Sequence, residues 1–490
     1  MQKKSTMNEK NSKIILEEYE NKFLYKKSKT NLDIQFNRIA FIFFVFLMIS
    51  IIFSIQLLHL GSLKKENIVK LLIIKKNYRA DIIDRNENYL AKSVSSIDIG
   101  ISPVEVIDKK RLLINLKLIF PNKNYKEIKK KFNRNKFFKF EKNISQINYE
   151  KIMSLGDKAI KPEEKLTRIY PQKNLFSHII GQIDDDNNGI SGIEKSFDKE
   201  LKTKKNLIRL TVDADIQFLI RQELLKFQKI FRAKGSAAIL MDVNNGDIIS
   251  MVSLPDFNLN ERKTIKDVNY INRATKGVYE FGSVFKTFTI AAGFNENLIE
   301  SNTKFLNLKK KIECNGFRIK EYNNKTPTNL TVEEILIRSG NIGSVRIGQK
   351  IGEKKFKSFL ETIGVLGKIN FDIEEVGKPH PIKWGKCKLA TASYGHGITT
   401  TLLQVAKGYS VITNGGYDIQ PTIIQKKFEV KNSRKRILNK GVSYKINKIL
   451  RKIVTNEEGT AKLANVDGYE VGGKTGTAQI SKNGKYTRDK

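Results

Sequence analysis

The chain has 490 residues, which is enough for two to four domains at roughly 100 to 200 residues each. Its 89 lysines and arginines exceed its 51 aspartates and glutamates and give a formal net charge of +38, while 40% of the residues are hydrophobic. This apolar content excludes an intrinsically disordered chain. Two cysteines, Cys314 and Cys387, exclude a disulfide framework and a cysteine zinc cluster, although they could pair with each other in an oxidising compartment.

The positive charge is spread over the whole chain, without a nucleic-acid-binding signature. Its densest stretch, from Lys123 to Lys142, interleaves basic residues with Phe132, Phe137, Phe138 and Phe140. We expect an amphipathic surface segment whose phenylalanines pack inward. The sequence therefore predicts no nucleic-acid partner, and salt-sensitive retention on DNA by residues 61–490 would contradict this prediction.

A predominantly apolar run extends from Ile39 to Leu60. At about 1.5 Å per residue, a helix of this length spans the hydrocarbon core of a bilayer. Because the run is longer than the apolar region of a cleavable signal peptide and has no small-residue cleavage site after it, we predict an uncleaved anchor over residues 39–60. Residues 1–38 are polar and are predicted to form a tail. Basic residues flank the apolar run on both sides, so charge alone does not orient it.

Residues 61–205 are predicted to form a mixed α+β region. The stretch from Arg79 to Asn86 is typical of a short strand followed by a turn, and Leu90 resumes the apolar pattern. Strand-like runs such as Ile97 to Ile101 then alternate with lysine-rich helical stretches. Because no catalytic residue types cluster here, we expect a non-catalytic, elongated pedestal.

A second domain is predicted over residues 206–490. It begins with a strand, a turn at Asp213 to Asp215 and a long amphipathic helix. A buried strand at Ala237 to Val243, a turn at Asn244 to Asp247 and a returning strand at Ile248 to Val252 follow. This domain therefore starts with a hairpin that packs on helices.

Three short motifs follow in this domain: Ser283-Val284-Phe285-Lys286, Ser339-Gly340-Asn341 and Lys474-Thr475-Gly476. The first opens an apolar helical run, so Ser283 is expected at a helix N-terminus with Lys286 one turn further on the same side. Asn341 is expected on a connector after a helix at Val332 to Arg338, and the third motif in a glycine-rich strand at 471–479. Each motif alone is weak, and taken singly each serine fits a helix cap or a turn; their order carries the prediction.

The combination indicates a serine nucleophile that works without histidine. A serine hydroxyl needs an adjacent base, and a lysine can serve only if its pKa falls from about 10.4 toward neutrality. Burial and a second cation such as Lys474 would lower the pKa of Lys286 in this way. The backbone N–H groups of Ser283 and Thr477 are then expected to hold the oxyanion. The four histidines are scattered, and we interpret them as structural.

The ordered motifs resemble those of class B penicillin-binding proteins, which are membrane-anchored peptidoglycan D,D-transpeptidases. The similarity extends from about residue 79 to the end of the chain and includes the segments RADIIDRN, RIYP, SLPDFNLN, YEFGSVFK, RSGN and SYGHGITTT. Within the family, Glu280-Phe281-Gly282 and Gly395-His396-Gly397 resemble the cell-division branch more than the elongation branch. The resemblance implies an α+β fold with one transmembrane helix, a pedestal and a serine β-lactamase-like transpeptidase domain, in which helices flank a central sheet.

The resemblance also implies a role for each motif residue. Ser283 would form the acyl-enzyme with a stem peptide that ends in D-Ala-D-Ala, and Lys286 would be its general base. Ser339 and Asn341 would relay protons and hold the substrate amide. The terminal carboxylate and the oxyanion site would involve Lys474, Thr475, Gly476 and Thr477. An amine of a neighbouring stem peptide would then complete the cross-link, and β-lactams would trap Ser283 as D-Ala-D-Ala mimics.

Location and partners follow from the same resemblance. It implies that residues 1–38 are a cytoplasmic tail and that the large part of the chain lies in the periplasm, held at the bacterial inner membrane by the single anchor. It implies a membrane-embedded glycosyltransferase and other divisome proteins as partners, and neither a metal nor a cofactor.

Three features depart from the family pattern. Glu87 stands in a turn where the family usually has glycine, and Gly340 is a tolerated variant within the second motif. The chain ends 14 residues after Gly476, where the fold would need further strands and a terminal helix. We therefore expect a fragment with an incomplete core and an exposed strand edge at 471–479, and its activity is left open.

Three alternatives to a septal transpeptidase remain open. An elongation-type transpeptidase carries the same motifs. So does a β-lactam sensor or hydrolase, although no glutamate is available in a placeable loop to activate water for deacylation. A non-catalytic divisome scaffold would keep only the anchor and the pedestal. Penicillin labelling separates these classes, because a synthase or sensor stays acylated, a hydrolase turns over and a scaffold is never labelled.

Overall fold

The computed structural model describes residues 38–62, 78–203, 206–261, 270–314, 316–322, 326–425, 435–479, 481–482 and 485–486. The chain divides into two units, residues 1–76 and 77–490, and each is described by itself. The predicted tail, residues 1–38, lies outside the described residues except for Arg38.

The first unit contains a helix at Arg38–Ser62, which includes the predicted anchor at 39–60. Within the described part of the chain, it is the one helix long and apolar enough to cross a membrane. Its large apolar side chains are all exposed, as expected for a helix whose surroundings are lipid.

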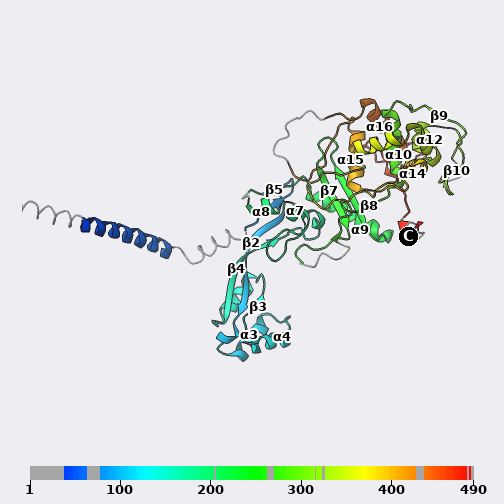
Figure 1. Ribbon diagram of the computed structural model, residues 1–490. Helices are drawn as coiled ribbons and strands as arrows, with labels where there is room; N and C mark the ends of the chain where they lie inside the picture. The colour runs from blue at the N-terminus through cyan, green and yellow to red at the C-terminus, as the bar shows by residue number, and fades with distance from the viewer. Residues whose placement is uncertain are drawn as a thin grey trace, which may run out of the picture. The chain divides into compact units, whose positions relative to one another are not determined.

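The second unit begins with a sheet in the order β3-β2-β1-β5, which lies mostly in the predicted pedestal. In this sheet β4 also pairs with β2, and Figure 1 shows these two strands side by side. Its strands are β1 (Ile82–Ile83), β2 (Tyr89–Ile101), β3 (Phe138–Glu141), β4 (Ile160–Ile169) and β5 (Ile208–Arg209). The long antiparallel ladder of β2 and β4 runs from Lys92 opposite Ile169 to Ile101 opposite Ile160. Glu87, in the turn between β1 and β2, has a φ of 69°, so this position keeps the left-handed backbone that glycine adopts most readily.

A small separate core forms where helices cover one end of the β2 and β4 ladder. These helices are α3 (Lys109–Ile119), α4 (Tyr125–Asn133) and α5 (Gln146–Met153), with a 3₁₀ helix, η1, at Pro103–Glu105. Phe132 and Phe140 are buried in this core, as the sequence predicts for the lysine-rich stretch. The same prediction is wrong for Phe137, whose side chain is 55% exposed because it precedes β3 and does not face the core.

Buried charges join the start of the pedestal to its short helices, α6 (Ser177–Ile180), α7 (Gly192–Ser196) and α8 (Asp198–Thr203). Both Arg79 and Arg168 donate to the carboxylate of Glu194, Arg168 over 2.8 Å, and these three side chains are at most 1% exposed. Arg79 also bonds Asp198 over 2.7 Å. Two buried guanidinium groups therefore depend on a single buried carboxylate.

The second domain opens with α9 (Ala214–Ile230) and the antiparallel hairpin of β6 (Ser236–Met241) and β7 (Ile248–Leu254). Helices α9 and α15 (Leu402–Thr413) both contact the hairpin, and β7 is buried along almost its whole length. The predicted strand, helix and hairpin are confirmed with shifted bounds. The helix starts earlier because Asp213 caps it, and the first hairpin strand is half-buried rather than buried.

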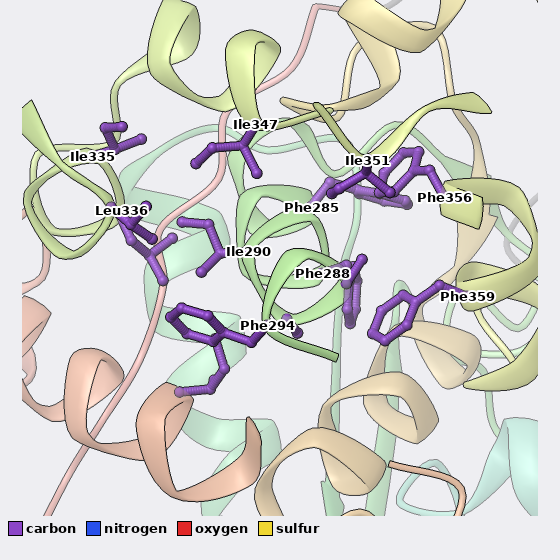
Figure 2. Close-up of a cluster of buried hydrophobic side chains, with 14 of the residues drawn as sticks. Phe285, Phe288, Ile290, Phe294, Ile335, Leu336, Ile347, Ile351, Phe356 and Phe359 are labelled. Carbon is purple, nitrogen blue, oxygen red and sulfur yellow. The ribbon is translucent and has the colours of Figure 1, made fainter. Parts of the chain in front are cut away.

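The main core surrounds α10 (Phe285–Asn295), which is buried from Phe285 to Phe294. Figure 2 shows its phenylalanines among side chains of the neighbouring helices. These helices are α11 (Val332–Ile337), α12 (Asn341–Ile351), α13 (Glu353–Thr362), α14 (Lys386–Ala392), α15 and α16 (Lys440–Thr455). A helix that is buried on all sides lies at the centre of a core, which fixes the helix that follows Ser283 firmly in place.

Short two-stranded pairs complete the fold. They are β8 (Val278–Tyr279) with β13 (Thr400–Thr401), β9 (Lys304–Phe305) with β12 (Leu330–Thr331), β10 (Lys311–Cys314) with β11 (Phe317–Lys320), and β14 (Ser481–Lys482) with β15 (Lys485–Tyr486). Further 3₁₀ helices in the described part of the chain are η3 (Gly282–Val284) and η4 (Lys462–Ala464). Cys314 and Cys387 form a disulfide that joins the β10–β11 hairpin to α14.

The strand predicted at 471–479 is wrong, because this segment is not part of any sheet in the described residues. It runs instead beside α16, where Gly473 N donates to Leu450 O over 3.1 Å, and then beside η3. A strand forms only where a second strand pairs with it, and here the neighbours are helices. The chain therefore holds the third motif against η3 without a strand ladder.

Candidate active site

The predicted nucleophile lies where three separate backbone segments meet. Ser283 is half-buried in η3, directly before α10. The preceding Gly282 has a φ of +56°, and a Cβ atom there would lie 2.1 Å from the Thr477 carbonyl oxygen. Tyr409 donates to the Val284 carbonyl over 3.1 Å and so ties η3 to α15. Among the described residues, the Ser283 hydroxyl has no hydrogen-bond partner and is open to a substrate.

Lys286 lies in the first turn of α10 and is 1% exposed. Its Nζ atom donates to Ser339 O over 2.5 Å, to Ser339 Oγ over 3.1 Å and to Asn341 Oδ1 over 2.6 Å. Burial and then the positive charge of Lys474 lower the pKa of Lys286 to about 7, against the opposing negative charge of Glu321. In a large fraction of the molecules, the Lys286 amine is therefore neutral at neutral pH.

The second motif turns sharply between two helices. Ser339 has a φ of +58°, and this left-handed turn lets both its carbonyl and its hydroxyl oxygen accept from Lys286. Asn341 is the first residue of α12, not part of a longer connector as the sequence suggested. The connector is shorter because the Glu321 carboxylate accepts hydrogen bonds from the first backbone N–H groups of α12 and so caps this helix.

The third motif brings a second lysine to the same place. The Nζ atom of Lys474 donates to Ser339 Oγ and to Thr475 O, over 3.0 Å in each case. The side chain is half-buried, and burial lowers its pKa to about 8. The Ser339 hydroxyl therefore lies between the two lysine amines, one from α10 and one from the segment at 471–479.

The remaining residues of the third motif border Ser283. The hydroxyl of Thr475 pairs with that of Thr460 over 3.0 Å. A Cβ atom on Gly476 would lie 2.4 Å from the Phe281 carbonyl, and the Thr477 backbone contacts Gly282. The structure thus brings together the eight residues that the sequence analysis singled out: Ser283, Lys286, Ser339, Asn341, Lys474, Thr475, Gly476 and Thr477.

Several supporting residues were missed by the sequence analysis as parts of this site. The Glu280 carboxylate accepts from Gly397 N over 3.0 Å and lies 3.7 Å from Nδ1 of His396. Tyr409 donates a hydrogen bond to Val284 of η3, and the Glu321 carboxylate accepts one from Asn341 N. Glu280 lies three residues before Ser283, and this short spacing could have indicated that it belongs to the site. The other two act across long sequence separations, which no motif spacing reveals.

No group of three or more His, Cys, Asp or Glu side chains suits a metal ion in the part of the chain that the structure describes. The site combines the Ser283 hydroxyl with the buried amine of Lys286 and the second amine of Lys474. A neutral Lys286 can take a proton, and Lys474 can hold an anion.

The model of the penicillin binding protein transpeptidase domain matches residues 236–490, slightly more than half of the chain. The chain belongs to the penicillin-binding protein transpeptidase family. The model of the penicillin-binding protein dimerisation domain matches residues 74–226, which overlap most of the predicted pedestal at 61–205. The resemblance inferred from the three motifs and the α+β fold are therefore confirmed.

Two of three similar relatives are named as probable peptidoglycan D,D-transpeptidases. A probable peptidoglycan D,D-transpeptidase FtsI of Caulobacter vibrioides is 28% identical over 82% of this chain and 69% of its own. Stage V sporulation protein D of Bacillus subtilis is 29% identical over 83% of this chain and 70% of its own. A probable peptidoglycan D,D-transpeptidase PenA of Neisseria meningitidis is 27% identical over 70% of this chain and 63% of its own. These relatives thus align with 70 to 83% of this chain.

Proposed function

We propose that this penicillin-binding protein is a serine D,D-transpeptidase that cross-links peptidoglycan stem peptides during septal wall synthesis. The observation that carries the proposal is the position of Lys286. Its buried amine lies one turn after Ser283, contacts Ser339 and Asn341, and has a pKa of about 7. A lysine with these properties can act as the general base for a serine that has no histidine partner.

In the proposed acylation step, Ser283 Oγ attacks the carbonyl carbon of the penultimate D-Ala while Lys286 takes the hydroxyl proton. The negative charge on the carbonyl oxygen falls near the backbone N–H groups of Ser283 and Thr477. The C–N bond then breaks, and the departing D-Ala amine receives a proton through Ser339 and the lysines. The result is an ester between Ser283 and the stem peptide.

In the second step, an amine of another stem peptide attacks this ester. Its proton passes to Lys286 or Ser339, a new amide bond forms, and Ser283 regains its hydroxyl proton. We assign the terminal carboxylate of the donor peptide to Lys474, with Thr475 and Thr477 beside it. This assignment is supported by the half-buried position of Lys474 at the Ser339 hydroxyl.

A periplasmic position at the inner membrane belongs to the same proposal, with residues 61–205 as the pedestal and 206–490 as the catalytic part. The disulfide between Cys314 and Cys387 supports it, because disulfides persist in the periplasm and are rare in the cytosol. The apolar helix at Arg38–Ser62 supports membrane anchoring. We further propose a membrane glycosyltransferase and other divisome proteins as partners. The name of the FtsI relative favours the septal over the elongation role.

The first experiment is a labelling gel with fluorescent penicillin on membranes that contain the 490-residue chain. Ser283→Ala is the test variant, and Ser358→Ala, an exposed serine on α13, is the matched control. We expect persistent labelling of the unsubstituted chain and of the control, and none of Ser283→Ala. Labelling that decays within minutes would indicate a hydrolase, and no labelling of any form would leave the scaffold function.

A second measurement tests the reaction itself. Incubation with a stem peptide ending in D-Ala-D-Ala and an amine acceptor should release D-Ala and form a cross-linked product in equal amounts. Release of D-Ala without the cross-link would contradict transpeptidation. Localisation of a fluorescent fusion at the division site, rather than along the side wall, would support the septal role over the elongation role.

A further inference from the structure

A carboxylate from the β10–β11 hairpin caps the helix that carries Asn341. Glu321 follows β11 directly, and its Oε2 atom accepts from Asn341 N over 2.7 Å while its Oε1 atom accepts from Ile342 N over 2.8 Å. The first N–H groups of a helix have no partner within the helix. Gly340, at the N-cap position of α12, has no side chain to supply one. Glu321, 20 residues away in sequence, takes the place of the missing cap.

The residue before Glu321 fixes the side chain of the same asparagine. Asn341 Nδ2 donates to Lys320 O over 2.7 Å, and Asn341 Oδ1 accepts from Lys286 Nζ over 2.6 Å. The amide is therefore held from both sides, with its oxygen toward the lysine. Its second N–H remains available for a substrate carbonyl. The side chain of Asn341 is thus bonded to Lys320, and its backbone N–H is bonded to the next residue, Glu321.

The hairpin itself has a second attachment. Cys314, at the end of β10, is joined by the disulfide to Cys387 on α14, and Cys314 pairs with Phe317 in the hairpin ladder. Glu321 therefore does not extend from a free loop. Its carboxylate belongs to an element fixed at its turn by a covalent bond and at its base by the two N–H groups of α12.

We propose that Glu321 is a positioning residue of the transpeptidase reaction, which holds the first turn of α12 so that Asn341 keeps its amide oxygen on the Lys286 amine. This inference rests on the proposed function. Glu321 touches neither Ser283 nor Lys286 through a hydrogen bond and acts through Asn341. Its role differs from that of an ordinary helix cap, because the capped residue, Asn341, accepts a hydrogen bond from the proposed general base, Lys286.

A second effect makes the proposal testable beyond stability. The charged groups that act on Lys286 are Lys474, which lowers its pKa, and Glu321, which raises it; its other polar neighbours are Ser339 and Asn341. Removal of the negative charge lowers the pKa of Lys286 further. The lower limb of the pH profile for acylation should then move toward lower pH, which a purely structural defect would not cause.

The test measures the rate of acylation by a fluorescent penicillin against pH, in the full chain. Glu321→Gln retains the shape, loses the charge and leaves one backbone N–H facing an amide NH₂ group. We expect a roughly 10- to 100-fold lower rate, from the loss of a charge-assisted hydrogen bond, and a lower limb displaced to lower pH. Glu321→Asp keeps the charge on a shorter stem, so it should keep the position of the limb and recover part of the rate.

Two matched variants separate positioning from stability. Glu313→Gln changes an exposed carboxylate of the same hairpin, which pairs with Arg318 over 3.0 Å. Glu334→Gln weakens a different cap, the capping box of Thr331 at the start of α11. Both should acylate at nearly the unsubstituted rate with an unchanged pH profile, and thermal unfolding of every variant reports whether it folds.

Three outcomes would overturn the inference. The first is an unchanged rate and pH profile in Glu321→Gln. The second is a rate loss in Glu321→Gln that leaves the limb in place and is matched by Glu334→Gln at an equal loss of thermal stability, which would make Glu321 a structural cap only. The third is no acylation of the unsubstituted chain at any pH, which would overturn the proposed function first and this inference with it.

Discussion

The Nζ atom of Lys474 donates a 3.0 Å hydrogen bond to the hydroxyl of Ser339. Lys286 donates to the same oxygen over 3.1 Å. A hydroxyl can accept two hydrogen bonds, but two ammonium groups this close repel each other. The favourable state therefore has one neutral amine and one cation. Lys286 is the more deeply buried and becomes neutral first, with a pKa of about 7 against about 8 for Lys474.

The rate of acylation should therefore depend on pH with two limbs. It should rise as pH increases through about 7, because Lys286 loses its proton and can act as a base. It should fall above about 8, because Lys474 loses the charge that holds the carboxylate of the substrate. Stopped-flow measurement of acylation by penicillin between roughly pH 5 and pH 10 tests this. A rate that still rises at the alkaline end would contradict the role of Lys474.

Gly282→Ala should lower the rate of acylation by on the order of 100-fold, because a displacement of about 1 Å at the nucleophile has effects of that size. A Cβ atom there would lie 2.1 Å from the Thr477 carbonyl, at a φ of +56°. Gly473→Ala is the matched control in the third-motif segment, since no atom lies within 4 Å of its Cβ position. Equal labelling of the two variants would contradict the close contact of η3 with Thr477.

The sequence determined the composition of the site better than its geometry. The order of the three motifs was enough to single out Ser283, Lys286 and Lys474 as candidates, because the chemistry restricts which residue types can act together. Periodicity likewise revealed α9 and the β6–β7 hairpin, whose apolar positions repeat locally.

Tertiary contacts account for what the sequence did not reveal. Asn341 was expected on a connector, yet it begins α12 because Glu321 caps that helix from a distant hairpin. The glycine-rich segment at 471–479 was expected to be a strand, but its neighbours are α16 and η3 and no strand pairs with it among the described residues. Neither partner is visible in the local sequence, since no periodic pattern encodes a contact between separate segments.

Replacement of both cysteines by serine should lower the free energy of unfolding by about 4 kcal/mol, from the entropy of closing a loop of this size. The disulfide spans 73 residues, between β10 and α14. Thermal or urea unfolding of Cys314→Ser/Cys387→Ser beside the unsubstituted chain measures this difference. The reductant dithiothreitol should destabilise the unsubstituted chain and leave the double variant unchanged; equal sensitivity of the two would contradict the pairing.

Glu194→Gln should destabilise the pedestal by roughly 3 to 5 kcal/mol, because Arg79 and Arg168 would remain buried without their shared carboxylate. Glu223→Gln is the control, since Glu223 and Lys226 form an exposed pair 3.6 Å apart whose loss should matter by less than about 1 kcal/mol. Chemical unfolding of both variants provides the comparison. Equal stability of the two variants would show that the ion pairs of Glu194 with Arg79 and Arg168 contribute little to the free energy of unfolding.

The contacts of Gly282, Gly395 and Gly476 also restrict how the chain can adapt to an inhibitor. A Cβ atom on Gly395 would lie 1.6 Å from the Gly282 carbonyl, and one on Gly476 would lie 2.4 Å from the Phe281 carbonyl. The wall around the nucleophile is therefore built from main chain, which no substitution can trim or reshape. We therefore expect variants that discriminate a bulky drug from a stem peptide to arise in the elements that support the site. The β10–β11 hairpin is one such element, because its side chains can change.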